Sequence, residues 1–460
     1  MKKVFLSLLA SVLFVPVFAE GYQVNVLSTK QTGMGHVGTG MKLGAESMHF
    51  NPAGLAFMRN AFDFSAGVSF VSARAKYKNG DYSEKTDNPI STPVYAYAGF
   101  KIYDNFAAGI AVTTPYGSSL KWPKNWRGAN LIQDISLKSY VIQPTFSYKI
   151  TDRLSIGAGL DLAVGNVKLS RGLFSPAEFQ ALAGMVSMLP SLTEQEKAYI
   201  AAAIKEIDGA VPVSATLDGK AKVRAGFNVG VMYDICDQVT VGLSYRSRIK
   251  MKVKEGEARL DYASSKIEQL LALLKDKTGG AVQIPPMNEG TFKAQLPLPS
   301  NLTLGVSYRP TDRWELALDL QYVGWKAYDS LNVVFTPNVL NGYTIKAEKN
   351  YKNTIIARVG AQYKTTERLD LRAGVYFDQS PIRSDNYNPE TPGMNKLGMS
   401  VGMSFAPISR LQIDFAFLYI QGFSRDGSYT QKTFTGGEEV FSGKYSSNAI
   451  TASLGLAYRF

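Results

Sequence analysis

The chain is 460 residues long, 45% of them hydrophobic and 12% aromatic, with a formal net charge of +12. Its basic side chains are scattered among acidic and aromatic ones, which argues against nucleic acid as a partner and favours lipopolysaccharide or anionic substrates. The single cysteine, Cys236, excludes a small fold held together by intramolecular disulfides, and its neighbours predict a short turn.

Residues 1–19 have the pattern of a secretory signal peptide. Lys2 and Lys3 precede an apolar core, and Val17-Phe18-Ala19 supplies a cleavage site before Glu20. We exclude this stretch from the fold and expect the mature chain to leave the cytoplasm. No later run of about 18 apolar residues predicts a membrane-spanning helix. Membrane insertion as a barrel stays open, because alternating strands have an unremarkable average hydropathy.

Residues 20–60 carry too little continuous apolar pattern for a core of their own. "GMGHVG", from Gly33 to Gly38, matches the glycine spacing of a dinucleotide site, but no βαβ unit follows, so we interpret it as a flexible plug segment. In "HFNPAGLAFM", Asn51-Pro52-Ala53 predicts a rigid bend, because proline fixes its own φ and restricts the residue before it. The bend is either a simple turn before the first strand or a part packed into something larger.

From residue 61 onward, apolar and polar residues alternate, as in "FDFSAGVSF", "QVTVGLSYR" and "RLQIDFAFLY". This period of two predicts strands with one apolar face. The other face carries Gly and Ser with several charged residues: Asp161, Arg246, Asp319, Arg358, Asp370, Arg372 and Asp414. A soluble sandwich would turn the apolar face inward, whereas an outer-membrane barrel would turn it toward lipid.

Connection lengths favour the barrel. We count fourteen strand candidates, joined alternately by short connections, such as 149–153 and 309–313, and long ones, such as 73–92 and 167–221. Short turns at one end and long loops at the other are typical of an outer-membrane barrel. The short turns "YKITDRL", "YRPTDRW" and "YKTTERL" each follow a tyrosine, which suits an aromatic girdle. The last strand ends in Phe460, as bacterial outer-membrane barrels do.

Two of the long loops contain helical patterns. "PAEFQALAGMVSML", "TEQEKAYIAAAIKEI" and "SSKIEQLLALLKDK" have helical spacing, and Thr193 with Glu196 forms a possible capping box. These helices either pack on one another or gather a hydrophobic ligand. Trp122 and Trp126 lie in another predicted outer loop, where they suit either first capture of an amphipathic molecule or anchoring at the interface.

The sequence does not favour an enzyme. The two histidines, His36 and His49, both precede the strands, so no histidine of the wall could act as the base of a barrel lipase. Two separated histidines and one cysteine also make no zinc site, and we expect no cofactor. The charges inside a barrel either pair with each other or contact ligand. Arginine suits a carboxylate, and the candidates are Arg246, Arg248, Arg358 and Arg372.

The sequence resembles the FadL family of outer-membrane transporters for long-chain fatty acids and other hydrophobic compounds. The resemblance rests on "GYQVNVLSTKQTGMGHVGTG", the Asn51-Pro52-Ala53 run, "LPLPSNLTLGVSYRP", "LRAGVYFDQSPI" and the final "YRF", spread over the mature chain. It implies an all-β, fourteen-stranded barrel over residues 61–460, closed from inside by an amino-terminal hatch over residues 20–60. It also implies that the protein lies in the outer membrane of a Gram-negative bacterium.

The resemblance further implies roles for individual residues. Hatch or ligand-path residues would be Tyr22, Phe50, Asn51, Pro52 and Ala53, with Tyr22 beside the high-affinity site. A kink in the third strand would open a lateral exit at Gly109, Pro115, Tyr116 and Gly117. Outer loops would capture the ligand, the lumen would bind it, and a hatch shift would let it diffuse sideways into the membrane. Asn51 would satisfy backbone groups left unpaired by the kink.

Other ligands and roles stay open at this stage. Aromatic or alkane hydrocarbons would lack the carboxylate of a fatty acid, and a structural or adhesive barrel would need no apolar pocket behind its loops. The partners we expect are the hydrophobic ligand, membrane lipid, lipopolysaccharide and the barrel assembly machinery. We expect a monomer that binds no nucleic acid.

Overall fold

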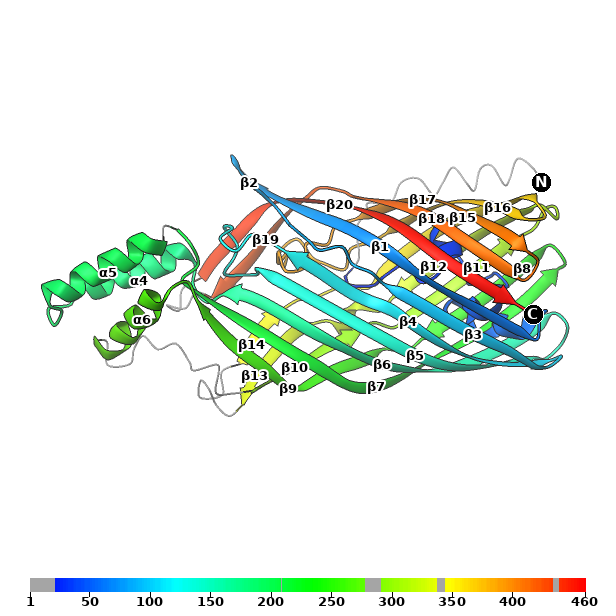
Figure 1. Ribbon diagram of the computed structural model, residues 1–460, viewed down its shortest axis with the longest axis horizontal. Coiled ribbons are helices and arrows are strands. Elements are labelled where there is room, and N and C mark those ends of the chain that lie inside the picture. Colours follow the sequence, from blue (N-terminus) through cyan, green and yellow to red (C-terminus); the bar gives the residue numbers. More distant parts are fainter. Residues whose placement is uncertain (1–20, 208, 278–290, 337–343, 433–437) are drawn as a thin grey trace.

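A computed structural model describes residues 21–207, 209–277, 291–336, 344–432 and 438–460; the predicted signal peptide lies outside these ranges. The described strands form one closed antiparallel barrel (Figure 1). Closure is direct, because β1 (Phe62–Asn79) pairs on one side with β3 (Val94–Tyr103) and on the other with β20 (Glu438–Arg459).

The wall consists of fourteen strands, as predicted. Eight are continuous over their described residues: β1, β3, β4 (Phe106–Lys121), β5 (Asp134–Lys149), β6 (Leu154–Gly172), β7 (Val213–Cys236), β16 (Leu369–Asp378) and β17 (Lys396–Ile408). Five are each formed by two segments: β8 (Val239–Arg246) with β9 (Ile249–Tyr262), β10 (Thr291–Leu298) with β11 (Asn301–Tyr308), β12 (Trp314–Val323) with β13 (Ser330–Thr336), β14 (Thr344–Glu348) with β15 (Thr354–Thr366), and β18 (Leu411–Gly422) with β19 (Arg425–Lys432). The last is β20, and β2 (Tyr82–Lys85) folds back on the end of β1 as a hairpin.

The apolar face of the strands points outward. On β20, Leu454 and Leu456 are 45% and 42% exposed, whereas Ser453 and Ala457 are buried on the lumen side. The same holds around the wall, where Tyr148, Tyr308 and Trp314 are exposed near the short turns. This arrangement excludes the soluble sandwich and matches a barrel whose outer surface meets lipid.

The two ends of the barrel differ as expected, but the long loops are shorter than predicted. The β1–β20 ladder continues from Asp63 opposite Arg459 as far as Lys78 opposite Lys444, and β7 already begins at Val213. Much of the predicted loop sequence is therefore strand that extends past the apolar band. The residues there pair by backbone hydrogen bonds without needing an alternating pattern. Cys236 is the last residue of β7, directly before the short turn, and is exposed.

Three helices project beyond the end that carries the long connections: α4 (Pro176–Ser187), α5 (Glu194–Ile207) and α6 (Ser265–Lys277) (Figure 1). The predicted capping box is present, since the Thr193 amide donates to Glu196 over 2.8 Å and the Glu196 amide donates back to the Thr193 hydroxyl over 3.2 Å. Phe179, Ile200 and Leu270 belong to one buried cluster, so the helices pack on one another. Among the described residues, no helix is long and apolar enough to cross a membrane.

Residues 21–58, here called the inner segment, lie inside the barrel and are mostly buried. The segment contains only short helices: α2 (Thr29–Thr32), η1 (Gly44–Glu46), α3 (Ser47–Phe50) and η2 (Pro52–Phe57). Its backbone bonds to wall side chains. Asp319 accepts hydrogen bonds from the amides of Gly38 and Thr39 over 2.9 and 3.1 Å, and Ser147 accepts one from Ala56 over 3.1 Å. The wall therefore supplies the order that this segment cannot supply itself.

Glycines in the wall let the inner segment approach as bare backbone. A Cβ atom added at Gly242 would lie 1.9 Å from the Thr39 carbonyl oxygen, and one at Gly374 would lie 2.1 Å from the Gly35 nitrogen. Such distances are closer than any side chain can occupy. We call the wall glycines that meet the backbone of the inner segment in this way the glycine belt: Gly157, Gly242, Gly305, Gly360, Gly374 and Gly402.

Candidate functional site

Strand β4 loses its regular pairing halfway along. Its ladder with β3 ends where Tyr95 faces Thr113, and its ladder with β5 shifts register between Thr113 and Tyr116. This shift is a bulge with one extra residue in β4. The bulge contains Pro115, which has no amide hydrogen to donate. Past Thr113, one edge of β4 is therefore left without its neighbouring wall strand.

The start of the inner segment occupies that free edge. The Val24 amide donates to the Pro115 carbonyl over 2.9 Å, and the Gly117 amide donates to the Tyr22 carbonyl over 2.9 Å. Gln23 and Tyr116 thus form an antiparallel pair. Three of the residues predicted for the lateral exit, Pro115, Tyr116 and Gly117, lie at this irregularity.

Gly109, the fourth residue of that group, does not. It pairs regularly with Gly99 in β3 and with Thr145 in β5, so the ladder is intact there. A Cβ at Gly109 would lie 2.7 Å from the sulfur of Met48. The glycine makes room for the inner segment and does not weaken the strand, so this part of the prediction is wrong.

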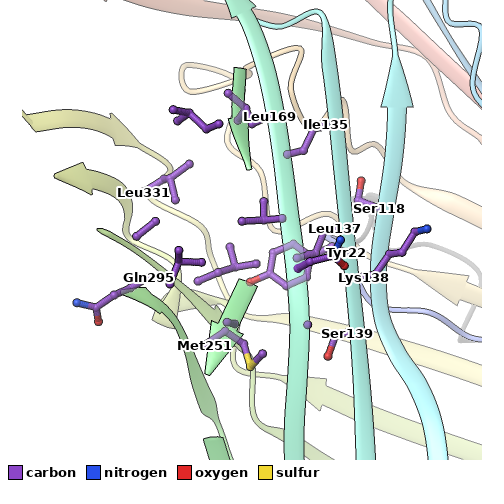
Figure 2. Close-up of a pocket in the computed structure, with 18 of the residues that line it drawn as sticks. Tyr22, Ser118, Ile135, Leu137, Lys138, Ser139, Leu169, Met251, Gln295 and Leu331 are labelled. Carbon is purple, nitrogen blue, oxygen red and sulfur yellow. The ribbon is translucent and has the colours of Figure 1, made fainter. Parts of the chain in front are cut away.

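A largely apolar cavity, the outer cavity, lies beside this edge (Figure 2). Figure 2 shows the Tyr22 ring projecting among Leu137 and Met251. The ring packs edge-on against Trp325, with 4.9 Å between the ring centres, and its hydroxyl donates to the Pro297 carbonyl. Because Tyr22 lines the cavity, its ring is placed where a ligand would meet it.

A buried ion pair borders the outer cavity. Glu390 lines it and accepts from the Lys349 ammonium group over 3.0 Å, with side chains only 7% and 1% exposed. Sequence reasoning missed both residues. Lys349 lies in the interruption between β14 and β15, and Glu390 lies in the connection between β16 and β17. In such irregular stretches, no periodic pattern indicates which side chains turn inward.

A second cavity, the inner cavity, lies on the other side of residues 22–24 and is more polar. Its lining includes Gln23, His36, His49, Phe50, Tyr116, Arg246 and Arg358. Tyr22 lines the outer cavity whereas Gln23 and Val24 line the inner one, so the strand formed by residues 22–24 separates the two. Of the predicted hatch residues, Tyr22 and Phe50 border a cavity.

Two of the four candidate arginines are neutralised by the wall. Arg246 contacts Asp161 over 2.8 Å and also donates to Gln143 over 3.2 Å. Arg372 lies 3.5 Å from Asp370 and donates to Gln362 and Ser404. For these two, pairing within the wall is the observed arrangement.

Arg358 and Arg248 behave differently. Arg358 is 3% exposed and donates to the Asn25 side chain over 3.1 Å, and no carboxylate of the described residues lies within 4.0 Å of its guanidinium. Arg248 is exposed, on the outer surface of the barrel, so its prediction as a lumen residue is wrong. The cause is a phase change between β8 and β9, because Arg246 and Ile249 both point inward.

Asn51-Pro52-Ala53 has a structural place away from the two cavities. The Asn51 side chain donates to the carbonyls of Thr39 and Val231 over 3.0 Å each, and its oxygen accepts from the Ala53 amide over 3.2 Å. Pro52 begins η2 directly after this cap. The expected bonds from Asn51 to the third strand are absent, because the side chain lies against β7.

Trp122 and Trp126 are buried, with 1% and 2% of their surfaces exposed. Their rings stack with 4.2 Å between centres, and both indole nitrogens donate to carbonyls of the protein. Trp126 also packs against Tyr77 of β1 and Phe441 of β20. Neither capture nor anchoring fits such enclosed rings, and both predicted roles are wrong. The pair forms part of the core that closes this end of the barrel.

Both histidines line the inner cavity. His36 and Phe50 lie in contact, 4.9 Å between ring centres, and His36 accepts from the Leu27 amide over 3.3 Å. Burial first, and then the neighbouring Arg358, hold the pKa of His36 well below its usual value of 6.5. Within the described ranges, no group of three or more His, Cys, Asp and Glu residues could hold a metal ion.

Comparison with known proteins identifies the family. Residues 10–460 match the family described as "Outer membrane protein transport protein (OMPP1/FadL/TodX)". The chain belongs to this family. It is 24% identical over 424 residues to the long-chain fatty acid transport protein of Escherichia coli K12, and 22% identical over 453 residues to outer membrane protein P1 of Haemophilus influenzae. The first alignment covers 91% of both chains, the second 92% of this chain and 91% of the relative.

Solved structures show the same fold. A FadL homologue of Pseudomonas aeruginosa superposes with a TM-score of 0.78 at 20% identity, covering 96% of this chain and 100% of the other. The toluene transporter TodX of Pseudomonas putida gives 0.66 at 20% identity, covering 97% and 100%. The protein is thus an outer-membrane transporter of hydrophobic compounds in a Gram-negative bacterium. From the rule for such barrels, we expect its short turns to face the periplasm and its helices to face the outside.

Proposed function

We propose that this FadL-family protein takes up long-chain fatty acids. The observation that supports the proposal most strongly is the strand of residues 22–24, which separates an apolar outer cavity from a polar inner one. A molecule with a long apolar chain and a polar head matches both environments. The surface that lines the outer cavity is mainly apolar, as the binding of an alkyl chain requires.

The head group would meet Arg358. Arg246 and Arg372 already have carboxylate partners, whereas the guanidinium of Arg358 holds one hydrogen bond to Asn25 and lines the inner cavity. Asp319 faces Arg358 across the ladder, but no ion pair within 4.0 Å joins the two side chains. A ligand carboxylate would give the buried guanidinium a direct partner with charge-assisted hydrogen bonds. Arg358 is therefore the contact we propose for the fatty-acid carboxylate.

The inner segment would act as a hatch. Its first residues hold the β4 edge with only two backbone hydrogen bonds, next to the place where β3 stops pairing. Release of residues 22–24 would join the two cavities and uncover that edge of the wall, and the ligand would leave sideways into the membrane. Ligand would move down its gradient, and no energy source is required.

Uptake of aromatic or alkane hydrocarbons is the second candidate. It is supported by the similarity in fold to toluene transporters, and it gives Arg358 no ligand to bind. A purely structural or adhesive barrel is the candidate from another class. It would have no use for an enclosed apolar cavity beside the weakly paired wall. As a member of a transport family, the protein is proposed to have no enzymatic role.

Uptake assays with Arg358→Gln test the proposal. In cells lacking their own transporters, we expect fatty-acid uptake at low concentration to fall roughly 10- to 100-fold, the worth of a hydrogen bond to a charged group. Toluene uptake should stay unchanged. Arg372→Gln is the matched control, since that arginine has a wall partner. Equal losses of uptake for both ligands would show that Arg358 only supports the hatch. Mass spectrometry of the purified protein is an independent test, because a fatty-acid transporter should carry fatty acids through purification.

A further inference from the structure

On the outer surface of the barrel, the apolar band gives way to lysine at one level of three neighbouring strands. Tyr140 of β5 and Val164 of β6 are opposite each other in the last apolar row. In the next outward-facing row toward the outer end, Asn166 of β6 stands between Lys138 of β5 and Lys220 of β7. The change takes place where the hydrocarbon of the membrane gives way to lipid head groups.

Five exposed or partly exposed lysines make up this surface, which we call the lysine patch: Lys138, Lys220, Lys222, Lys250 and Lys252. Lys222 of β7 and Lys252 of β9 lie directly opposite each other in the ladder. Like charges in such a position repel and destabilise the pair of strands. Within the described residues, no carboxylate lies within 4.0 Å of any of the five ammonium groups.

The acidic residues of this surface lie farther out. Asp218 of β7 faces Lys168 on one side and Glu257 of β9 on the other, so charges of both signs meet in that row. The lysine patch lies between this mixed row and the apolar band, whose border residue Val223 is 61% exposed. A repelling cluster of cations at this level therefore faces head groups and not open water.

We propose that the lysine patch binds the phosphate groups of the glycolipid in the outer leaflet, lipopolysaccharide. Lysine binds phosphate as a compact point charge, and a phosphate between Lys222 and Lys252 would remove their repulsion. From Lys138 to Lys252 the patch spans three steps between strands, about 14 Å, enough for more than one phosphate group. The patch lies on the part of the wall outside the outer cavity, so glycolipid there would hold the wall beside the ligand path.

The experiment compares two variants that each remove one cross-strand lysine pair. Lys222→Gln/Lys252→Gln removes the centre of the patch. Lys78→Gln/Lys444→Gln removes an exposed pair on β1 and β20, which lies beyond the apolar band and has Asp426 opposite Lys444. Both purified full-length proteins would be titrated in detergent with bisphosphorylated lipid A and, separately, with phosphatidylglycerol, and binding measured by native mass spectrometry.

We expect the patch variant to bind lipid A about 25-fold more weakly, about fivefold for each lysine near a phosphate surface, and the control variant to bind as the parent protein does. Equal binding of lipid A to the parent and to the patch variant would overturn the proposal. So would an equal loss in both variants, which would indicate unspecific attraction to net charge. An equal loss of phosphatidylglycerol binding would overturn the assignment to glycolipid. Unchanged heat-modifiable gel migration would show that both variants are folded.

Discussion

Gln23 and Tyr116 face each other as a pair that does not share hydrogen bonds, since the two bonds of this short ladder flank them. Cα atoms in such pairs are about 4.5 Å apart, within the range that a disulfide spans. In a Cys236→Ser background, Gln23→Cys/Tyr116→Cys should therefore form a disulfide that locks the start of the inner segment to β4. We expect uptake of hydrophobic compounds to stop on oxidation and to return with a reducing agent, measured with labelled ligand in cells.

A second disulfide serves as the control for this lock. Ser69 and Ser453 are cross-strand neighbours within the wall, and their hydroxyl oxygens are 2.7 Å apart. Ser69→Cys/Ser453→Cys should close without any effect on transport. Full uptake through the oxidised Gln23–Tyr116 lock would rule out movement of this strand as a step in transport.

The glycine belt predicts a leak. Gly242→Ala would place a methyl group 1.9 Å from the Thr39 carbonyl oxygen, so the inner segment must shift, at a cost of about 1–3 kcal/mol for overpacking. We expect higher ion conductance in planar bilayers and greater sensitivity of cells to large hydrophilic antibiotics. Gly184→Ala in α4, where nothing lies within 4 Å of the added atom, should have neither effect. Unchanged conductance of the Gly242→Ala protein would mean that the wall strand shifts and the inner segment stays in place.

The two buried histidines predict that acid weakens the seating of the inner segment. Burial is the main cause that lowers the pKa of His36 and of His49, and the cations Arg358 and Arg246 lower it further. A released segment would expose both histidines, which would then titrate near 6.5. The released state thus binds more protons than the seated state, so seating is favoured above pH 6.5 and weakens as the pH falls below it. Bilayer conductance should rise on acidification, and His36→Gln/His49→Gln should flatten that dependence.

Asn51→Ala should loosen the hatch without unfolding the barrel. The substitution removes the donor to the Thr39 and Val231 carbonyls and the cap on the Ala53 amide. Leaving such buried groups unsatisfied costs about 1–3 kcal/mol. We expect faster hydrogen exchange in residues 39–57, measured by mass spectrometry, with heat-modifiable gel migration as in the parent protein. Unaltered exchange there would reduce the Asn51-Pro52 bend to an ordinary turn.

The barrel could be predicted from sequence because every wall strand repeats the same pattern of residues. Each wall strand alternates between lipid and lumen, so a period of two recurs along the whole chain, and the helices follow their own period. Arg248 shows the limit of this reasoning. Between Arg246 and Ile249 the alternation shifts by one residue, and counting in twos across the interruption assigns the wrong face.

The positions of single side chains in long connections could not be predicted. Trp126 is buried because Tyr77 and Phe441, far away in sequence, cover it. The Lys349–Glu390 pair joins the interruption between β14 and β15 to the connection between β16 and β17. The partner of Asn51 was missed for the same reason, since only the folded chain brings it to Val231. The glycines of the wall were visible as residues on the lumen face, but their spacing alone gave no reason for their small size.

The glycine belt also bears on how such a transporter can diverge. Where the wall and the inner segment meet as backbone against backbone, the wall position must be glycine, while the side chain on the inner-segment residue can point elsewhere. Gly374 with Gly35, and Gly242 with Thr39, are backbone contacts of this kind. Residues that face the cavities can then mutate without opening a hole in the cell's permeability barrier. During evolution, changes at those residues could replace one hydrophobic substrate by another while the contact between the wall and the inner segment stays the same.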